Sequence, residues 1–151
     1  RIDAQDVSPQ LPRAEYRYVP APSNYSEIPL QKQSGTFVVP VLLNNSITLS
    51  FVVDSGASDV SIPADVVMTL MRTGTLKTSD FLGKKTYTLA DGSQVPSETF
   101  HIRSMKVGDR NISNVVASVT SIHGSLLLGQ SFLSRFKSWS IDNSRQVLLL
   151  D

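Results

Sequence analysis

The sequence predicts an all-β domain, a barrel or a sandwich with one or two short helices. Two observations support this prediction: short runs rich in Val, Ile, Leu, Thr and Phe recur along the chain, and turn-forming residues separate them at regular spacing. A length of 151 residues corresponds to one domain, or to one domain with a tail. With 40% hydrophobic and 18% charged residues, the chain has the composition of a globular protein.

Residues 1–30 differ from the rest of the chain because they hold five of its eight prolines. Proline fixes φ and lacks an amide donor, so we expect this segment to be an extended arm or linker. Two interpretations stay open, a flexible lead-in from an upstream segment or an extra strand docked on the domain. The domain itself is expected to span residues 31–151.

From Gly35 onward, β-type runs alternate with turns. Asn44-Asn45 suits a hairpin turn, and Asp91-Gly92 and Gly108-Asp109 mark two further turns. Pro63 is expected at the first position of a helix that ends at Gly74. The expected strands are Thr36–Leu43, Ile47–Val53, Val60–Ile62, Thr86–Leu89, Val95–Met105, Asn111–Val119, Ser125–Leu128, Ser138–Ile141 and Val147–Leu150, with a second short helix at Ser131–Phe136.

Composition excludes several classes of function. The chain has no cysteine, which excludes a disulfide scaffold, thiol catalysis and cysteine-based zinc sites. Two histidines, His101 and His123, are too few for a histidine-rich metal centre, and no Gly-x-Ser-x-Gly elbow accompanies them. A formal net charge of +1 argues against nucleic acid as a partner. No apolar run approaches the ~20 residues that span a bilayer.

One segment presents candidate chemistry. Residues 51–57 read Phe-Val-Val-Asp-Ser-Gly-Ala, an apolar strand that delivers Asp54 into a tight turn, where Gly56 permits a backbone that would strain other residues. Burying a carboxylate is costly, so Asp54 needs hydrogen-bond donors or a function. The segment alone leaves two interpretations equally open: Asp54 caps the turn, or it takes part in catalysis.

Two later segments favour catalysis. An apolar strand, Leu126-Leu127-Leu128, ends at Gly129, and Tyr87–Ser93 has the sequence of a hairpin. In this order, the three segments resemble the signature of retropepsin-like aspartic proteases. Residues 126–133, Leu-Leu-Leu-Gly-Gln-Ser-Phe-Leu, are similar to the bacterial single-domain members in particular. The resemblance covers the chain from about Thr36 to Leu150.

The resemblance implies a closed β barrel that forms one lobe per chain and an aspartic endopeptidase that needs no cofactor or metal. In this family each protomer of a homodimer supplies one catalytic Asp, and this chain has one Asp-Ser-Gly. Two Asp54 carboxylates about 3 Å apart would share one proton and activate a water that attacks an extended peptide. The remaining implied site residues are Ser55, Gly56 and Ala57 in the active-site loop, Ala90, Asp91, Gly92 and Ser93 in the flap, and Leu127, Leu128 and Gly129 in the supporting strand.

Individual residues carry further expectations from this resemblance. Ser55 would link the two active-site loops through its hydroxyl, and Asp91 is expected to form the flap turn. Ala57 has no hydroxyl to donate to a carboxylate, which predicts activity at milder acidity than pepsin-like enzymes favour. Val147–Leu150 is either a dimer contact or a core strand of its own subunit.

The sequence departs from the retroviral pattern beside the active-site turn. Retroviral members usually have an Asp two residues after the catalytic Gly and an Arg soon after the later Gly, which form an ion pair. Here those places hold Ser58 and Gln130, while Asp59 and Arg135 are shifted along the chain. Whether Asp59 and Arg135 meet is left open.

Some alternatives remain. The fold could serve as a peptide-binding or dimerisation module that does not cleave, and replacing Asp54 with Asn would discriminate the two. Residues 1–30 could act as a pro-segment that covers the cleft. The resemblance alone suggests a periplasmic or membrane-associated extracytoplasmic location, with any anchor upstream of this chain.

Overall fold

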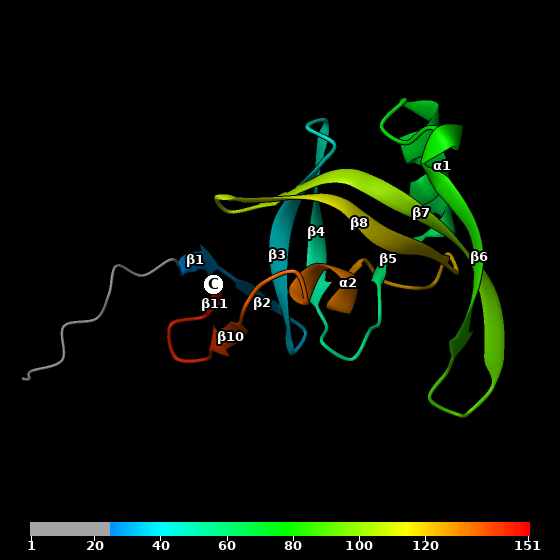
Figure 1. Cartoon of the computed structure of the whole chain (residues 1–151). Helices are drawn as coiled ribbons and strands as arrows, with labels where there is room; N and C mark the ends of the chain where they lie inside the picture. Colours follow the sequence, from blue (N-terminus) through cyan, green and yellow to red (C-terminus); the bar gives the residue numbers. More distant parts are fainter. Residues whose placement is uncertain (1–24) are drawn as a thin grey trace, which may run out of the picture.

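The structure is a computed structural model that describes residues 25–151, so most of the expected N-terminal arm lies outside the described residues. The elements are the strands β1 (Ser26–Pro29), β2 (Gln31–Gln33), β3 (Thr36–Leu43), β4 (Ile47–Val53), β5 (Val60–Pro63), β6 (Phe81–Thr88), β7 (Gln94–Val107), β8 (Arg110–Thr120), β9 (Leu127–Leu128), β10 (Trp139–Asp142) and β11 (Val147–Leu150), the helices α1 (Ala64–Arg72) and α2 (Gln130–Leu133), and the 3-10 turn η1 (Thr78–Asp80) (Figure 1).

The predicted all-β fold is confirmed as a barrel with two short helices. Eight strands pair in the order β2-β3-β4-β9-β5-β8-β7-β6, and β3 also pairs with β7. This extra pairing, through Leu42↔Lys106 and Leu43↔Met105, closes the six strands β3, β4, β9, β5, β8 and β7 into a ring. The ring leaves β6 outside, paired only with β7, where both strands extend into a hairpin beyond the barrel (Figure 1).

The interior of the barrel holds the apolar side chains that alternate along the strands. Phe51 of β4, Phe100 of β7 and Phe132 of α2 are fully buried members of this core. Helix α1 turns Val67 and Leu70 towards this core, where both are buried. None of the helices in residues 25–151 is long and apolar enough to cross a membrane.

Local turn chemistry explains why the strand boundaries could be predicted. Asn44 and Asn45 have φ values of +48° and +55° at the centre of a tight turn that the Ser46 amide closes on the Leu43 carbonyl at 2.8 Å, and β3 and β4 have the predicted bounds. Pro63 differs from the prediction, because it ends β5 and caps α1 instead of starting it. The strand predicted at Thr86–Leu89 is longer than expected, beginning at Phe81, and the one predicted at Ser125–Leu128 keeps only its last two residues.

The end of the predicted arm is a strand of the fold. Ser26–Pro29 pairs antiparallel with Val147–Leu150, which in turn pairs with Trp139–Asp142. Leu148 and Leu150 are fully buried. Val147–Leu150 is thus a core strand of its own subunit, with β11 central between β1 and β10 in this three-stranded sheet.

An ion pair between the buried Asp80 and the partly exposed Arg103 ties η1 to the barrel. The Asp80 carboxylate accepts hydrogen bonds from the Lys77 amide at 2.9 Å and the Arg103 Nε at 3.0 Å, and Arg103 also reaches the Thr75 carbonyl at 2.8 Å. Burial of the Asp80 carboxyl opposes its ionisation, but these donors outweigh it and hold its pKa below the ordinary value.

We expect Asp80→Asn to lower the free energy of unfolding by about 1–3 kcal/mol at pH 7. A carboxyl whose pKa is lower in the folded state stabilises the fold above the unfolded pKa of about 3.9 and loses this effect as the pH falls through the folded value. The difference between the variant and the wild type should therefore shrink towards pH 3 and below. Urea unfolding at both pH values checks this, with the exposed Glu98→Gln as the control; a difference independent of pH would contradict it.

Candidate active site

Asp54 lies where two distant strands meet. It follows β4 directly, and β4 runs parallel to β9 through Val52↔Leu127 and Val53↔Leu128. The Asp54 amide donates to the Leu128 carbonyl at 3.2 Å. The structure thus brings together the two apolar segments that the sequence analysis singled out, with Asp54 at the end of one and Gly129 at the end of the other.

The Asp54 carboxylate is held on one side and open on the other. Its Oδ1 accepts the Gly56 amide at 2.9 Å, and its side chain is partly exposed. Within residues 25–151, Oδ2 accepts no hydrogen bond. Asp54 therefore caps its own turn, as one sequence interpretation proposed, and still has an oxygen free for chemistry.

The neighbouring loop residues have roles that differ in part from those expected. Gly56 does not need positive φ; a Cβ at this position would lie 3.2 Å from Asp54 Oδ1, so glycine leaves room beside the carboxylate. Ser55 is exposed, and its hydroxyl makes no hydrogen bond in the described part of the chain. Ala57 is partly buried, and its amide donates to the Asp54 carbonyl at 3.2 Å.

The start of α2 fastens the active-site loop. Gln130 donates from its amide to the Ala57 carbonyl at 2.8 Å and from Nε2 to the Ser55 carbonyl at 2.9 Å. The Ser131 amide donates to the Ser58 carbonyl at 3.0 Å. The Ser131 hydroxyl accepts a hydrogen bond at 2.8 Å from the amide of Val60, the first residue of β5. Gln130 thus stands where retroviral members have the Arg of an ion pair and supports the loop by hydrogen bonds instead.

The flap expected at residues 87–93 is the hairpin of β6 and β7. Asp91 forms its turn, because its Oδ1 accepts the Ser93 amide at 2.9 Å and the Ser93 hydroxyl at 2.6 Å. These bonds lower the pKa of Asp91, the hydroxyl contributing most. Gly92 has a φ of +88°, which glycine adopts without strain, and Ala90 is exposed beside it.

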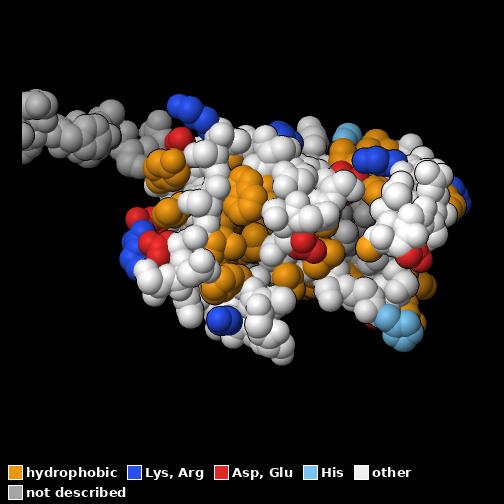
Figure 2. Space-filling model, turned by 90° about the horizontal axis from the view of Figure 1, so that it is seen from below, with side chains coloured by type: hydrophobic (Ala, Val, Ile, Leu, Met, Phe, Trp, Pro, Cys, Tyr) orange, Lys and Arg blue, Asp and Glu red, His pale blue; other side chains and the backbone are white. Residues whose placement is uncertain are grey.

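A pocket of about 460 Å³ separates the flap from the active-site loop. Figure 2 views the molecule from below and shows apolar side chains gathered in the middle of this face, with most of the charged side chains towards its rim. Apolar and hydroxyl side chains line the pocket together. They come from the loop (Gly56, Ala57, Ser58, Asp59), from β5 (Ser61), from the flap (Tyr87, Thr88, Leu89, Val95, Ser97) and from the end of β8 (Ser118, Val119, Thr120, Ser121).

The partner of Asp59 could not be predicted from the sequence. The buried Asp59 carboxylate forms an ion pair with Lys85 and accepts a hydrogen bond from the Tyr87 hydroxyl, both from the flap strand. Arg135 is exposed and forms no ion pair among the described residues. The alternation of Lys85 and Tyr87 in a strand could have indicated that both face the same side, but not which carboxylate they meet. Across residues 25–151 no three His, Asp or Glu side chains are grouped closely enough to hold a metal ion.

A barrel of this topology with an Asp-Ser-Gly turn beside an apolar-Gly strand defines a retropepsin-like aspartic protease lobe. The family model described as "gag-polyprotein putative aspartyl protease" matches residues 39–135, more than half of the chain, so the chain belongs to this family of aspartyl proteases.

The fold is similar to a solved structure of the same class. A retropepsin-like aspartic protease from Rickettsia conorii aligns with a TM-score of 0.62 and 23% sequence identity, over 88% of this chain and 96% of that one. At this identity the likeness supports the fold. No curated protein matches the sequence.

Proposed function

We propose that the protein is an aspartic endopeptidase that works as a homodimer, with one Asp54 from each protomer. The observation that supports this most directly is the Asp54 carboxylate, which is fixed at one oxygen by the Gly56 amide and open at the other. One hydrogen bond fixes the orientation of this carboxylate, while the second oxygen stays available to a water or a substrate. The chain contains one such turn, so a pair of carboxylates needs a second copy.

The proposed chemistry follows from two carboxylates at a two-fold axis. At about 3 Å they cannot both ionise and therefore share one proton. The ionised Asp54 takes a proton from a water, whose oxygen attacks the peptide carbonyl carbon, while the protonated one donates a hydrogen bond to the carbonyl oxygen. A proton then passes to the leaving nitrogen as the C–N bond breaks.

The proposed substrate is an extended peptide lying between the flap and the active-site loop. The flap strands leave backbone groups available near the hairpin tip, where Ala90 to Ser93 are exposed, and an extended peptide can pair with such groups as an added strand. The pocket beside Ala57 would receive one side chain of the peptide. The periplasmic or membrane-associated location stays part of this proposal and rests on the resemblance alone.

Digestion of an unstructured protein such as casein from pH 3 to pH 8 tests the proposed function. The Asp54→Asn protein, prepared in parallel, serves as the control for contaminating proteases. Cleavage by the wild type with an acidic optimum, absent in the variant, is the expected result. A folded wild-type protein that cleaves nothing across this range would contradict the proposal.

Mixing the two proteins tests whether the site is shared. If each active dimer needs two intact Asp54 carboxylates, a ninefold excess of Asp54→Asn should lower the activity of a fixed amount of wild type about tenfold, because most wild-type protomers then pair with a variant. Casein cleavage after re-equilibration measures this, with bovine serum albumin at the same concentration as the control. Activity independent of the added variant would show a site complete in one chain.

A further inference from the structure

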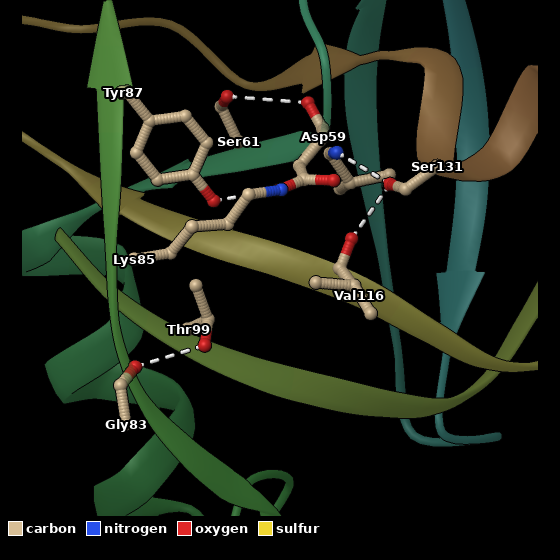
Figure 3. A network of polar contacts seen from close by, with 9 residues as sticks. Asp59, Ser61, Gly83, Lys85, Tyr87, Thr99, Val116 and Ser131 are labelled. Atoms are coloured by element: carbon tan, nitrogen blue, oxygen red, sulfur yellow. Dashed lines mark hydrogen bonds and ion pairs between the residues drawn. The ribbon is translucent and has the colours of Figure 1, made fainter.

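Asp59 is a buried carboxylate with partners from a different element. It lies in the loop after the active-site turn, and its side chain is 7% exposed. Lys85 Nζ donates to its Oδ2 at 3.1 Å, and the Tyr87 hydroxyl donates to the same oxygen at 2.5 Å. Figure 3 shows both side chains reaching from the flap strand to this one group.

The outer part of the flap has few other connections to the barrel. From residue 84 to residue 97, the remaining side-chain hydrogen bonds and ion pairs in the described chain stay within the hairpin, apart from a bond between Tyr87 and Ser118 of β8. Nearly all side chains of this segment are exposed, so apolar packing holds it weakly. The position of the hairpin therefore depends on Asp59.

Asp59 itself is firmly placed. Its carbonyl packs against Gly129, and the amide of the next residue, Val60, donates to the Ser131 hydroxyl. Five residues upstream lies Asp54, whose turn α2 fastens through Gln130 and, again, Ser131. Asp59 thus connects the flap to the part of the structure that orients Asp54.

We propose that Asp59 is a positioning residue that anchors the flap over the cleft, with the Tyr87 hydroxyl and the Lys85 ammonium as its two attachments. This inference rests on the proposed function, because it assigns the anchored hairpin the role of covering a peptide. Burial first, and then the adjacent Asp59 carboxylate, raise the pKa of Tyr87 above its ordinary value, so its hydroxyl remains a donor from acidic to neutral pH.

Hydrogen exchange of the flap amides tests the anchor without any substrate. In Asp59→Asn, Tyr87→Phe and Lys85→Met, amides of residues 84–97 should exchange faster than in the wild type, about tenfold for Tyr87→Phe. The matched control is Lys84→Met, the neighbouring lysine, which pairs with Glu98 at 3.5 Å on the exposed side of the hairpin. Core amides such as those of Ile102 and Val115 should exchange at the wild-type rate in every variant.

The result that overturns the proposal is wild-type exchange of the flap in both Asp59→Asn and Tyr87→Phe. Should Asp59→Asn fail to fold, Tyr87→Phe decides alone, since it removes one oxygen from a partly exposed side chain on an outer strand. Faster exchange in Lys84→Met to the same extent would also overturn it, because the effect would then not depend on Asp59.

Kinetics separate positioning from general damage. A loosened flap must be ordered again by each substrate, so Tyr87→Phe should raise KM for a peptide several-fold, with kcat changed less. A merely structural defect would instead lower the active fraction, which reduces apparent kcat and leaves KM unchanged. Faster flap exchange in a protein that never cleaves would support the anchor and refute the proposed function, whereas wild-type exchange in a cleaving enzyme would refute the anchor alone.

Discussion

Replacing Asp54 with asparagine should lower peptide-bond hydrolysis about 10³-fold or more. The amide cannot take a proton from water, and both sites of a symmetric dimer change at once. The amide oxygen can still accept the Gly56 amide, as Oδ1 does in the wild type, so the turn should keep its shape. Initial rates of peptide cleavage between pH 3 and pH 8 measure the effect.

The matched control for this experiment is Asp91→Asn. It also exchanges one exposed turn carboxylate for an amide, and the new side chain can still accept from Ser93. We expect this variant to keep most of its activity, because the amide can maintain the Asp91 turn and the proposed peptide pairing uses backbone groups of the hairpin tip, which the substitution leaves in place. Equal loss of activity in both variants, or a folded Asp54→Asn protein that cleaves like the wild type, would refute the assignment of Asp54.

Replacing Gly129 with alanine should both destabilise the protein and inactivate it. A Cβ at residue 129 would lie 2.7 Å from the Ala57 carbonyl oxygen and closer still to that of Asp59, and backbone atoms cannot move aside as side chains do. We expect a loss of about 3 kcal/mol in the free energy of unfolding, as for overpacked cores. Because the displaced segment is the loop after Asp54, activity should fall even in the protein that remains folded.

A comparison of two glycines isolates the cause. Gly129 has a φ of −98°, which any residue adopts, so its substitution acts through steric overlap alone. Gly35 has a φ of +82° with open space around it and lies in the turn between β2 and β3. Urea unfolding and peptide cleavage should show a small loss of stability, about 1 kcal/mol, and full activity for Gly35→Ala. A Gly129→Ala variant that behaves like Gly35→Ala would contradict the packing argument.

The parts of the structure that the sequence predicted are those with local causes. The hairpin turn at Asn44-Asn45 and the alternation of β3 and β4 depend on residues close in the chain, so their bounds were predicted correctly. The resemblance to known proteases supplied what local patterns could not, the proximity of Asp54 and the strand that ends at Gly129.

The parts that the sequence did not predict depend on contacts between distant segments. β1 is too short and too polar to be recognised until β11 is seen beside it. The partners of Asp59 lie 26 and 28 residues away, and nothing in the local pattern distinguishes them from solvent-exposed flap residues. The supporting role of Gln130 likewise follows from where α2 meets the loop, not from its residue type.

The pairing of β1 with β11 has a consequence for how the chain folds during synthesis. β1 leaves the ribosome before any strand of the barrel, whereas its partner emerges after all of them, so Ser26↔Leu150 is among the most non-local contacts of the molecule. The barrel can therefore close while β1 is still an unpaired edge, and the terminal sheet assembles last. Since these three strands meet beside the C-terminus, away from the tip of the β6–β7 hairpin (Figure 1), their late docking completes the fold at a distance from the flap.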